Sequence, residues 1–329
     1  MRSSGALVLC AWGLIACTTP MEPMEPMEPM EPMEPMEPME PMEPMVPRVS
    51  TVRLTPMLPM LPMPPFTPVR PDPDGCDIES PTGVFAATPI RSSTATRNGN
   101  SVAALREADA DGYRHVEIDV VLTADLELIQ GRYAEVGAYT TCRGLASEET
   151  AADLAGCEYL DDPGSHVLPI WHGLEGASFD AVYLDLKFTL FDDMVDPSTV
   201  IEAMVSLSER LGRPEMLVAM SYDGDVAEAL ATAGFRTGYK GYPAPSDALA
   251  FIEEAAVLGA EMVCIKASSL SADTVARSHT LGVWQLPWES AVVTDVPFVI
   301  GLIDAGVGGL ITDIPDFVQA VADGRCGGP

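Results

Sequence analysis

Between residues 84 and 312 the chain alternates short apolar, β-branched runs with amphipathic segments, and this alternation constrains the fold more than any other feature. Several amphipathic segments open on Ser, Asp or Asn and close on Gly, as capped helices do. Eight strands that alternate with helices predict an α/β protein with a parallel (β/α)8 barrel, the TIM-barrel architecture. A doubly wound open sheet is the alternative, but it usually has fewer strands, and the sequence has no glycine-rich phosphate loop. The runs expected to form strands are 84–90, 115–121, 181–188, 216–221, 235–239, 262–266, 282–287 and 309–312.

The N-terminal segment has the pattern of an export signal. Arg2 precedes an apolar stretch from Gly5 to Ile15, which leads into Cys17. This pattern is typical of a bacterial lipoprotein signal peptide over residues 1–16, with cleavage before Cys17 and lipid attached to its sulfur. An ordinary secretory signal or a short membrane anchor is the alternative, but the apolar run is too short to span a bilayer. We therefore expect an exported protein that an N-terminal lipid anchors to the membrane of the bacterial cell envelope.

Residues 17–75 are rich in proline. From Met21 to Met45 the triplet Met-Glu-Pro repeats eight times. A proline at every third position removes backbone donors and blocks helix, so this segment is predicted to be a disordered, polyproline-like, acidic tether. The methionine thioethers are also soft ligands of the kind that bind Cu(I), but no His or Cys accompanies them, which favours a spacer. The expected folded domain then covers residues 76–329.

The chain is strongly acidic, with a formal net charge of −31 at pH 7. The repeat does not explain this charge. Residues 1–75 carry ten acidic and four basic side chains, whereas the rest carries 39 acidic and 14 basic ones, a balance of −25. Binding to a phosphate backbone needs a basic face, so nucleic acid is not an expected partner.

Five cysteines follow the tether, in an exported environment that permits disulfides. Cys142 and Cys157 lie close together in one loop-like segment. Cys76 and Cys326 bracket the folded region, whose ends a closed barrel brings together. We therefore predict the disulfides Cys142–Cys157 and Cys76–Cys326, with Cys264 free in a strand. A zinc site is the alternative, but no Cys-x-x-Cys pair or histidine spacing supports it.

Two predicted strands carry charged residues among apolar neighbours. Glu117 and Asp119 are two residues apart and so face the same side of their strand, and Asp185 and Lys187 do the same in the next strand. In such a barrel, functional groups collect at the carboxyl ends of the strands. The three acids would suit a hard divalent cation, Mg²⁺ or Ca²⁺, with Lys187 beside it to bind an anion. A buried network of salt bridges to Arg or Lys from neighbouring strands is equally open.

Four segments are similar, in order and spacing, to one known family. The segment ending in HVEIDVV looks like the approach to a Glu-x-Asp metal pair, and YLDLKF looks like an acidic-x-Lys strand. VWQLPW and GVGGLITDIPDFV resemble a seventh-strand tryptophan segment and a closing Gly-x-x-Gly run. The family is the glycerophosphodiester phosphodiesterases, (β/α)8 barrels related to the spider-type phospholipase D toxins. The resemblance implies metal ligands at Glu117, Asp119 and Asp185, and substrate contacts at Arg91, Lys187 and Trp284.

The same resemblance implies two catalytic histidines that act as general acid and base, and neither is present. The first corresponds to Ile90 and the second to Gly131. Neither residue transfers a proton, and a positioned acid or base contributes typically about 10²- to 10⁴-fold. If the correspondence holds, histidines introduced at both positions are expected to restore some activity.

Four histidines elsewhere in the chain are candidates to replace them. His115 shares a strand face with Glu117 but lies nearer the amino end of the strand. His279 ends a predicted helix, where a histidine favours the helix dipole. His166 and His172 lie in the long segment before residue 181 and could fold over the barrel.

These observations leave three hypotheses. The first is a surface lipoprotein whose phosphodiesterase-like domain is catalytically impaired and binds a phosphorylated or polyol ligand. The second is an active, divergent, metal-dependent phosphoric diester hydrolase that acts on glycerophosphodiesters or phospholipid headgroups. The third is a barrel that serves only as the head of a surface stalk. The missing histidines favour the first hypothesis.

Overall fold

The computed structural model describes residues 84–86, 101–160, 162–191, 196–288, 296–312 and 318. All of them belong to one unit of the chain, residues 57–329. Several sequence predictions lie outside the described residues, and they concern the signal peptide, the tether, Cys17, the Cys76–Cys326 pair, Ile90 and Arg91.

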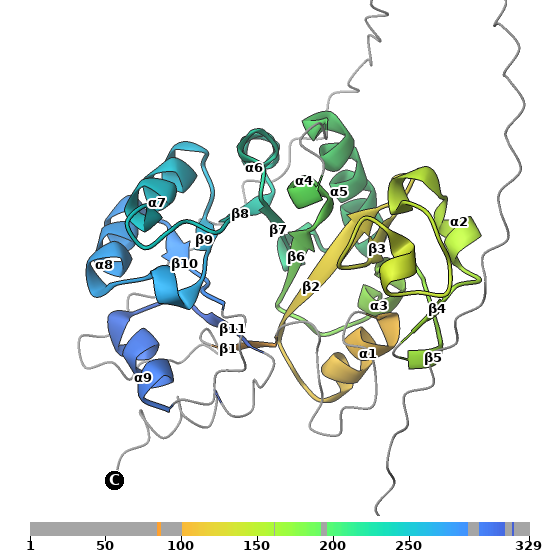
Figure 1. The fold of residues 1–329 in the computed structure, drawn as a ribbon, viewed down its shortest axis with the longest axis horizontal. Helices are drawn as coiled ribbons and strands as arrows, with labels where there is room; N and C mark the ends of the chain where they lie inside the picture. Colours follow the sequence, from red (N-terminus) through yellow and green to blue (C-terminus); the bar gives the residue numbers. More distant parts are fainter. Residues whose placement is uncertain are drawn as a thin grey trace, which may run out of the picture. The chain divides into compact units, whose positions relative to one another are not determined.

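Eight parallel strands form a closed barrel, which confirms the predicted fold (Figure 1). Neighbouring strands pair in the order β10, β9, β8, β7, β6, β2, β1 and β11. Trp288, just beyond β10, closes the seam by pairing with Lys266 on one side and with Ile311 on the other. The strands are β1 (Val84–Ala86), β2 (His115–Leu122), β6 (Ala181–Leu186), β7 (Leu217–Ser221), β8 (Arg236–Lys240), β9 (Met262–Cys264), β10 (Trp284–Gln285) and β11 (Leu310–Thr312).

Helices surround the barrel, and local sequence explains where they begin and end (Figure 1). Ser101 accepts a hydrogen bond from an amide in the first turn of the helix that follows it, and Ser271 and Thr274 form a capping box. Gly212 and Gly282 end two helices at φ values of 62° and 76°, which glycine adopts without steric cost. The helices are α1 (Val102–Ala110), α3 (Trp171–Leu174), α4 (Phe188–Phe191), α5 (Pro197–Leu211), α6 (Gly224–Thr232), α7 (Ala248–Val257), α8 (Ala272–Leu281) and α9 (Val296–Ala305), with 3-10 turns η3 (Pro214–Met216) and η4 (Ala267–Ser269).

None of these helices, in the part of the chain that the structure describes, is both long and apolar enough to cross a membrane.

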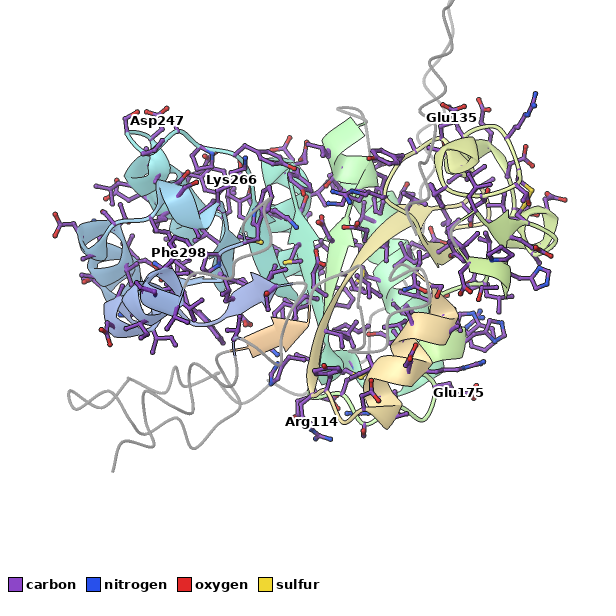
Figure 2. The ribbon with its side chains drawn as sticks, turned by 60° about the horizontal axis from the view of Figure 1, so that its bottom comes forward. Arg114, Glu135, Glu175, Asp247, Lys266 and Phe298 are labelled. Atoms are coloured by element: carbon purple, nitrogen blue, oxygen red, sulfur yellow. A yellow bond between two sulfur atoms is a disulfide. The ribbon has the colours of Figure 1, made fainter. Side chains whose placement is uncertain are left out.

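Figure 2 shows the two ends of the barrel. Arg114, directly before β2, and Glu175 lie on one side of the molecule, whereas Glu135 and Asp247 lie on the opposite side. The first side is the amino end of the strands, and the second is the carboxyl end.

Residues 123–180, which we call the insertion, separate β2 from β6 and have a small core of their own. The first strand of the insertion folds back and pairs antiparallel with the end of β2. Cys142 and Cys157 form the predicted disulfide. Ile129, Leu154 and Tyr159 are among the buried side chains that pack around it. The elements of the insertion, besides α3, are β3 (Leu128–Gln130), η1 (Val136–Ala138), η2 (Ala146–Glu148), α2 (Ala151–Leu154), β4 (Glu158–Tyr159) and β5 (Asp162–His166).

The packing of β2 explains how two carboxylates come to lie inside the barrel. Val116, Ile118 and Val120 are fully buried in the main core between the strands and the helices. The residues between them, Glu117 and Asp119, therefore face the barrel interior. Burial of each of these aliphatic side chains contributes roughly 1.5–3 kcal/mol.

Candidate functional site

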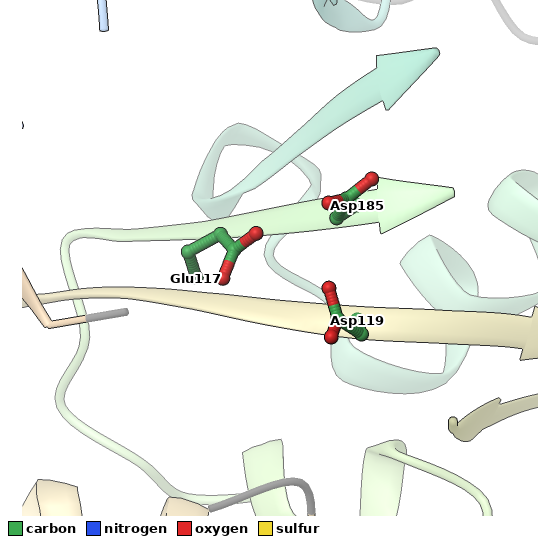
Figure 3. A group of neighbouring side chains, drawn as sticks. All are labelled: Glu117, Asp119 and Asp185. Atoms are coloured by element: carbon green, nitrogen blue, oxygen red, sulfur yellow. The ribbon is translucent and has the colours of Figure 1, made fainter. Parts of the chain in front are cut away.

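Three acidic side chains from two neighbouring strands meet inside the barrel (Figure 3). Asp119 of β2 lies directly opposite Asp185 of β6 in the strand register, and Glu117 precedes Asp119 by two residues on the same face. One carboxylate oxygen from each side chain lies within 4.8 Å of the other two. All three residues are buried. The structure thus brings together the three acids that the sequence analysis selected.

Two lysines lie among these carboxylates. The ammonium group of Lys187, directly after β6, lies 3.0 Å from Asp119 Oδ1 and 2.5 Å from Asp185 Oδ2. The ammonium group of Lys240, the last residue of β8, lies 3.3 Å from Glu117 Oε1 and also contacts Asp185 Oδ2. We call these five residues the acid–lysine cluster. Its three carboxylates and two ammonium groups, when all are ionised, leave a net charge of −1.

Asp185 is the centre of the cluster. Its Oδ2 accepts hydrogen bonds from Lys187, from Lys240 and, at 3.3 Å, from the Tyr222 hydroxyl. Its Oδ1 is buried and has no hydrogen-bond partner among the described residues. A buried polar atom without a partner is costly. Oδ1 is therefore the atom of the cluster that would gain most from a further donor.

Burial and charge act in opposite directions on these groups. Burial raises the pKa of Glu117 to about 7, although Lys240 opposes this shift. Burial also raises the pKa of Asp119, against the effect of Lys187. At Asp185 burial is outweighed by Lys240 and Lys187, which hold the carboxyl pKa below its ordinary value. At Lys240 burial is likewise outweighed, chiefly by Asp185, so its pKa lies well above the ordinary value. Asp185 and Lys240 are therefore charged at neutral pH.

Three aromatic side chains, which we call the aromatic rim, follow the carboxyl ends of β7, β8 and β10: Tyr222, Tyr242 and Trp288. The rings of Tyr222 and Tyr242 stack with their centroids 5.8 Å apart, and Trp288 meets Tyr242 edge-on at 5.5 Å. The Lys240 ammonium lies 5.7 Å from the Tyr222 centroid, and the Lys266 ammonium lies 5.5 Å from the Trp288 centroid, both within cation–π range. Tyr242 is 53% exposed, so the rim offers an aromatic surface to a ligand.

The tryptophan of the site lies four residues later than the sequence analysis placed it. Trp284 is the first residue of β10 and pairs with Met262, the first residue of β9, toward the amino end of the strands. Its ring packs on Gly308, where a Cβ would lie only 2.2 Å from a ring carbon. Trp284, for which the sequence analysis predicted a substrate contact, thus lies away from the carboxyl end, and the tryptophan that lies there, beside Lys240, is Trp288.

The position to which the resemblance assigns the second catalytic histidine, Gly131, is filled by another part of the chain. The Gly131 amide donates to the Asp119 carbonyl at 3.1 Å, so a side chain at 131 would project on the same side as that of Asp119. A Cβ there would lie 2.3 Å from Tyr139 Oη and 2.8 Å from Val121 Cγ2. Tyr139, which belongs to the insertion, therefore occupies the space that a histidine would need.

The Tyr139 hydroxyl is buried and has no hydrogen-bond partner among the described residues. Burial raises its pKa above the ordinary value, so it stays protonated at neutral pH. In its protonated form this hydroxyl cannot act as a general base at neutral pH.

The four histidines of the chain all lie on described elements, and none follows the carboxyl end of a barrel strand. His115 opens β2 at the amino end, where burial lowers its pKa to about 4. His172 stacks on Trp171 in α3. His279 lies in the last turn of α8, and His166 ends β5. The structure gives none of them the position of the missing acid or base.

The cluster has the donor atoms of a divalent-cation site but not its charge. Carboxylate oxygens suit Mg²⁺ or Ca²⁺, and these three acids could hold a metal ion. Two ammonium groups, however, contact all three acids, and both would repel a divalent cation placed between them. In this arrangement the residues form a salt-bridge network, one of the two alternatives that the spacing left open, and the two ammonium groups contact oxygens that a divalent cation would otherwise bind.

Solved structures show what this architecture is similar to, whereas no family model and no curated protein sequence matches the chain. A phosphodiesterase from Oleispira antarctica, in complex with its product sn-glycerol 3-phosphate, matches with a TM-score of 0.60 at 20% identity over 73% of this chain and 96% of its own. The chain has the glycerophosphodiester phosphodiesterase fold. A glycerophosphodiester phosphodiesterase from Parabacteroides distasonis gives 0.59 at 19% over 74% and 98%, and one from Agrobacterium tumefaciens gives 0.56 at 18% over 72% and 99%. Identities this low establish the fold alone, so function has to be argued from the site.

The sequence analysis missed six residues of this candidate site, namely Tyr139, Tyr222, Lys240, Tyr242, Lys266 and Trp288. A signal existed for Lys240, because the chain contains only three lysines and each ends or closely follows an apolar strand. A signal also existed for Trp288, which is the second tryptophan of VWQLPW. No local pattern pointed to Tyr139, because its place depends on the path of the insertion.

Proposed function

We propose that this protein is a surface lipoprotein whose phosphodiesterase-like barrel binds a small phosphorylated or polyol ligand without hydrolysing it at an enzymatic rate. One observation carries the proposal. The acid–lysine cluster and the aromatic rim stand together at the carboxyl end of the barrel, whereas Tyr139 fills the space beside Gly131 where a catalytic histidine would be needed.

The chemistry of the site supports a ligand with an anionic end and a less polar end. Lys187 keeps 12% of its side chain exposed, and Lys266 is partly exposed beside Trp288. Ammonium groups bind phosphate as point charges. The exposed face of Tyr242 suits the carbon-bound hydrogens of a glycerol or another polyol. The Oleispira antarctica structure holds sn-glycerol 3-phosphate, which makes that compound the first probe.

The place of the protein in the cell is part of the proposal. The signal over residues 1–16, the cysteine at its end and the proline-rich segment support a barrel tethered to the membrane of the cell envelope. Metabolic labelling with palmitate tests this part. Label is expected in the wild type and absent from Cys17→Ser, and label that persists in Cys17→Ser would contradict the assignment.

Calorimetry and hydrolysis assays on the full-length protein test ligand binding. We expect sn-glycerol 3-phosphate to bind, Lys187→Met to abolish that binding, and glycerophosphocholine to remain intact with Mg²⁺, Ca²⁺ or Mn²⁺. Arg277→Met is the control, because it removes a cation that pairs with Glu253 on the outer surface. Metal-dependent turnover that Glu117→Gln abolishes would establish the second hypothesis instead. No binding of any probe would leave the barrel as the head of a stalk.

A further inference from the structure

All three lysines of this chain lie at one end of the barrel. The sequence contains fifteen arginines and only three lysines, Lys187, Lys240 and Lys266. Two of them belong to the acid–lysine cluster, and the third lies against Trp288 of the rim. By contrast, Arg114 and Arg277 pair with acids on the outside of the barrel. Lysine is thus confined to the site in a protein that otherwise uses arginine as its cation.

The geometry of the cluster explains why lysine is used there. An ammonium group is a compact charge with three rotatable donors, whereas a guanidinium is a larger, planar group whose five donors have a fixed geometry. The Lys240 side chain is only 5% exposed and reaches from β8 to acids on two other strands, Glu117 of β2 and Asp185 of β6. A compact ammonium group contacts two buried carboxylates here without the planar geometry that a guanidinium would require.

We propose that Lys240 is the resident cation of this site and stands in for a divalent metal, so that the barrel binds the phosphate group of its ligand without a metal ion. The ligand-binding part of this inference rests on the proposed function. Carboxylates bind Mg²⁺ and Ca²⁺ at roughly 2.0–2.6 Å, in shells of about six or more oxygens. Here one oxygen of Glu117, Oε1, and one of Asp185, Oδ2, are already bound to the ammonium group of Lys240. With Lys240 in place, Lys187, which also pairs with Asp119 and Asp185, and Lys266 supply the partly exposed positive charge for the anion.

Binding measurements on the full-length wild type give the first test. Calorimetry with sn-glycerol 3-phosphate is carried out in EDTA and again with Mg²⁺, Ca²⁺ or Mn²⁺. The dissociation constant is expected to be the same in all four conditions. A metal that tightens binding about tenfold or more would overturn the inference. If the probe binds in no condition, the proposed function fails, and the metal experiments below still test the role of Lys240.

Substitution of Lys240 gives the second test. In Lys240→Met the three carboxylates keep one ammonium group, so the variant is expected to gain a metal-dependent rise in melting temperature that the wild type lacks. Lys266→Met is the matched control, since Lys266 lies at the same end of the barrel but contacts Trp288. This variant is expected to show no such rise in melting temperature. A folded Lys240→Met variant whose melting temperature does not change with any of the three metals would overturn the inference.

Nuclear magnetic resonance of the wild type keeps the inference testable if Lys240→Met does not fold. Protein labelled with ¹⁵N only in lysine gives three side-chain signals, all from the site. Paramagnetic Mn²⁺ is expected to leave the Lys240 signal sharp. Broadening of the Lys187 and Lys240 signals at stoichiometric Mn²⁺ would show a metal among the carboxylates and would overturn the inference.

Discussion

At Asp185 two ammonium groups and a hydroxyl converge on one carboxylate, whereas at Gly131, beside the neighbouring strand, there is no room even for a Cβ atom. The first region is built from the barrel strands β2, β6 and β8 themselves. The second is closed by Tyr139 of the insertion. The comparison teaches that the acid–lysine cluster depends on the barrel strands, whereas the space beside Gly131 depends on the path of the insertion.

The largest effect is expected from breaking the charged region. Asp185→Asn leaves two buried ammonium groups with one carboxylate fewer, and loss of one member of a buried ion network typically costs about 3–5 kcal/mol. Urea unfolding of the full-length protein measures the loss. Asp180→Asn is the control, because Asp180 pairs with Arg114 at the surface and such pairs contribute about 0–1 kcal/mol. Equal losses in the two variants would contradict the central role of Asp185.

The pH dependence of stability gives a second test of the acid–lysine cluster, through Glu117. Its pKa rises from 4.5 to about 7 on folding, so the folded state holds this proton more tightly than the unfolded state does. Protonated Glu117 therefore stabilises the folded state fully below pH 4.5. As the pH rises to 7 this contribution to the free energy of unfolding is lost, and the loss is on the order of 3 kcal/mol. The stability difference between wild type and Glu117→Gln, measured from about pH 4 to 8, should change in that window. A difference that does not vary with pH would refute the shift.

A smaller loss of stability is expected from substitutions at Gly131, where Tyr139 fills the space. Gly131→Ala places a Cβ against Tyr139 and Val121, and overpacking of this kind costs typically about 1–3 kcal/mol. The expectation that histidines at 90 and 131 restore activity needs correction for the same reason, since an imidazole at position 131 has no space while Tyr139 is present. In a double-mutant cycle, Tyr139→Ala should recover part of the stability that Gly131→His loses. Independent effects of the two substitutions would contradict the overlap.

The smallest effect is expected from removing one oxygen atom. Tyr139→Phe deletes a buried hydroxyl that has no partner among the described residues, so stability should stay within about 1 kcal/mol of the wild type and is expected to rise. Tyr159→Phe is the matched control, because the Tyr159 hydroxyl donates to the Gln130 carbonyl at 3.2 Å and its removal should destabilise. A clear loss in Tyr139→Phe would show that this hydroxyl has a partner after all.

The barrel and half of the site could be predicted from the sequence, because both depend on strand periodicity. Alternation within residues 115–121 placed Glu117 and Asp119 on one face, and the order of strands brought Asp185 beside them. Lys240 lies on a strand that pairs with neither β2 nor β6, so its contact depends on the curvature of the closed barrel. Tyr139 reaches Gly131 through a long irregular path. Neither arrangement leaves a local pattern in the sequence.

Trp288 combines two tasks that proteins usually assign to different residues. Its backbone amide donates to Ile265, its carbonyl accepts from Ala267, and the Ile311 amide bonds the residue before it, so this short stretch joins the last strands of the barrel. Its ring meanwhile forms part of the rim. A ligand that rests on this ring would press on the seam of the barrel, and its arrival should slow the exchange of the Ile311 amide hydrogen with solvent. Ligand binding would then lower the frequency with which the barrel opens at this seam.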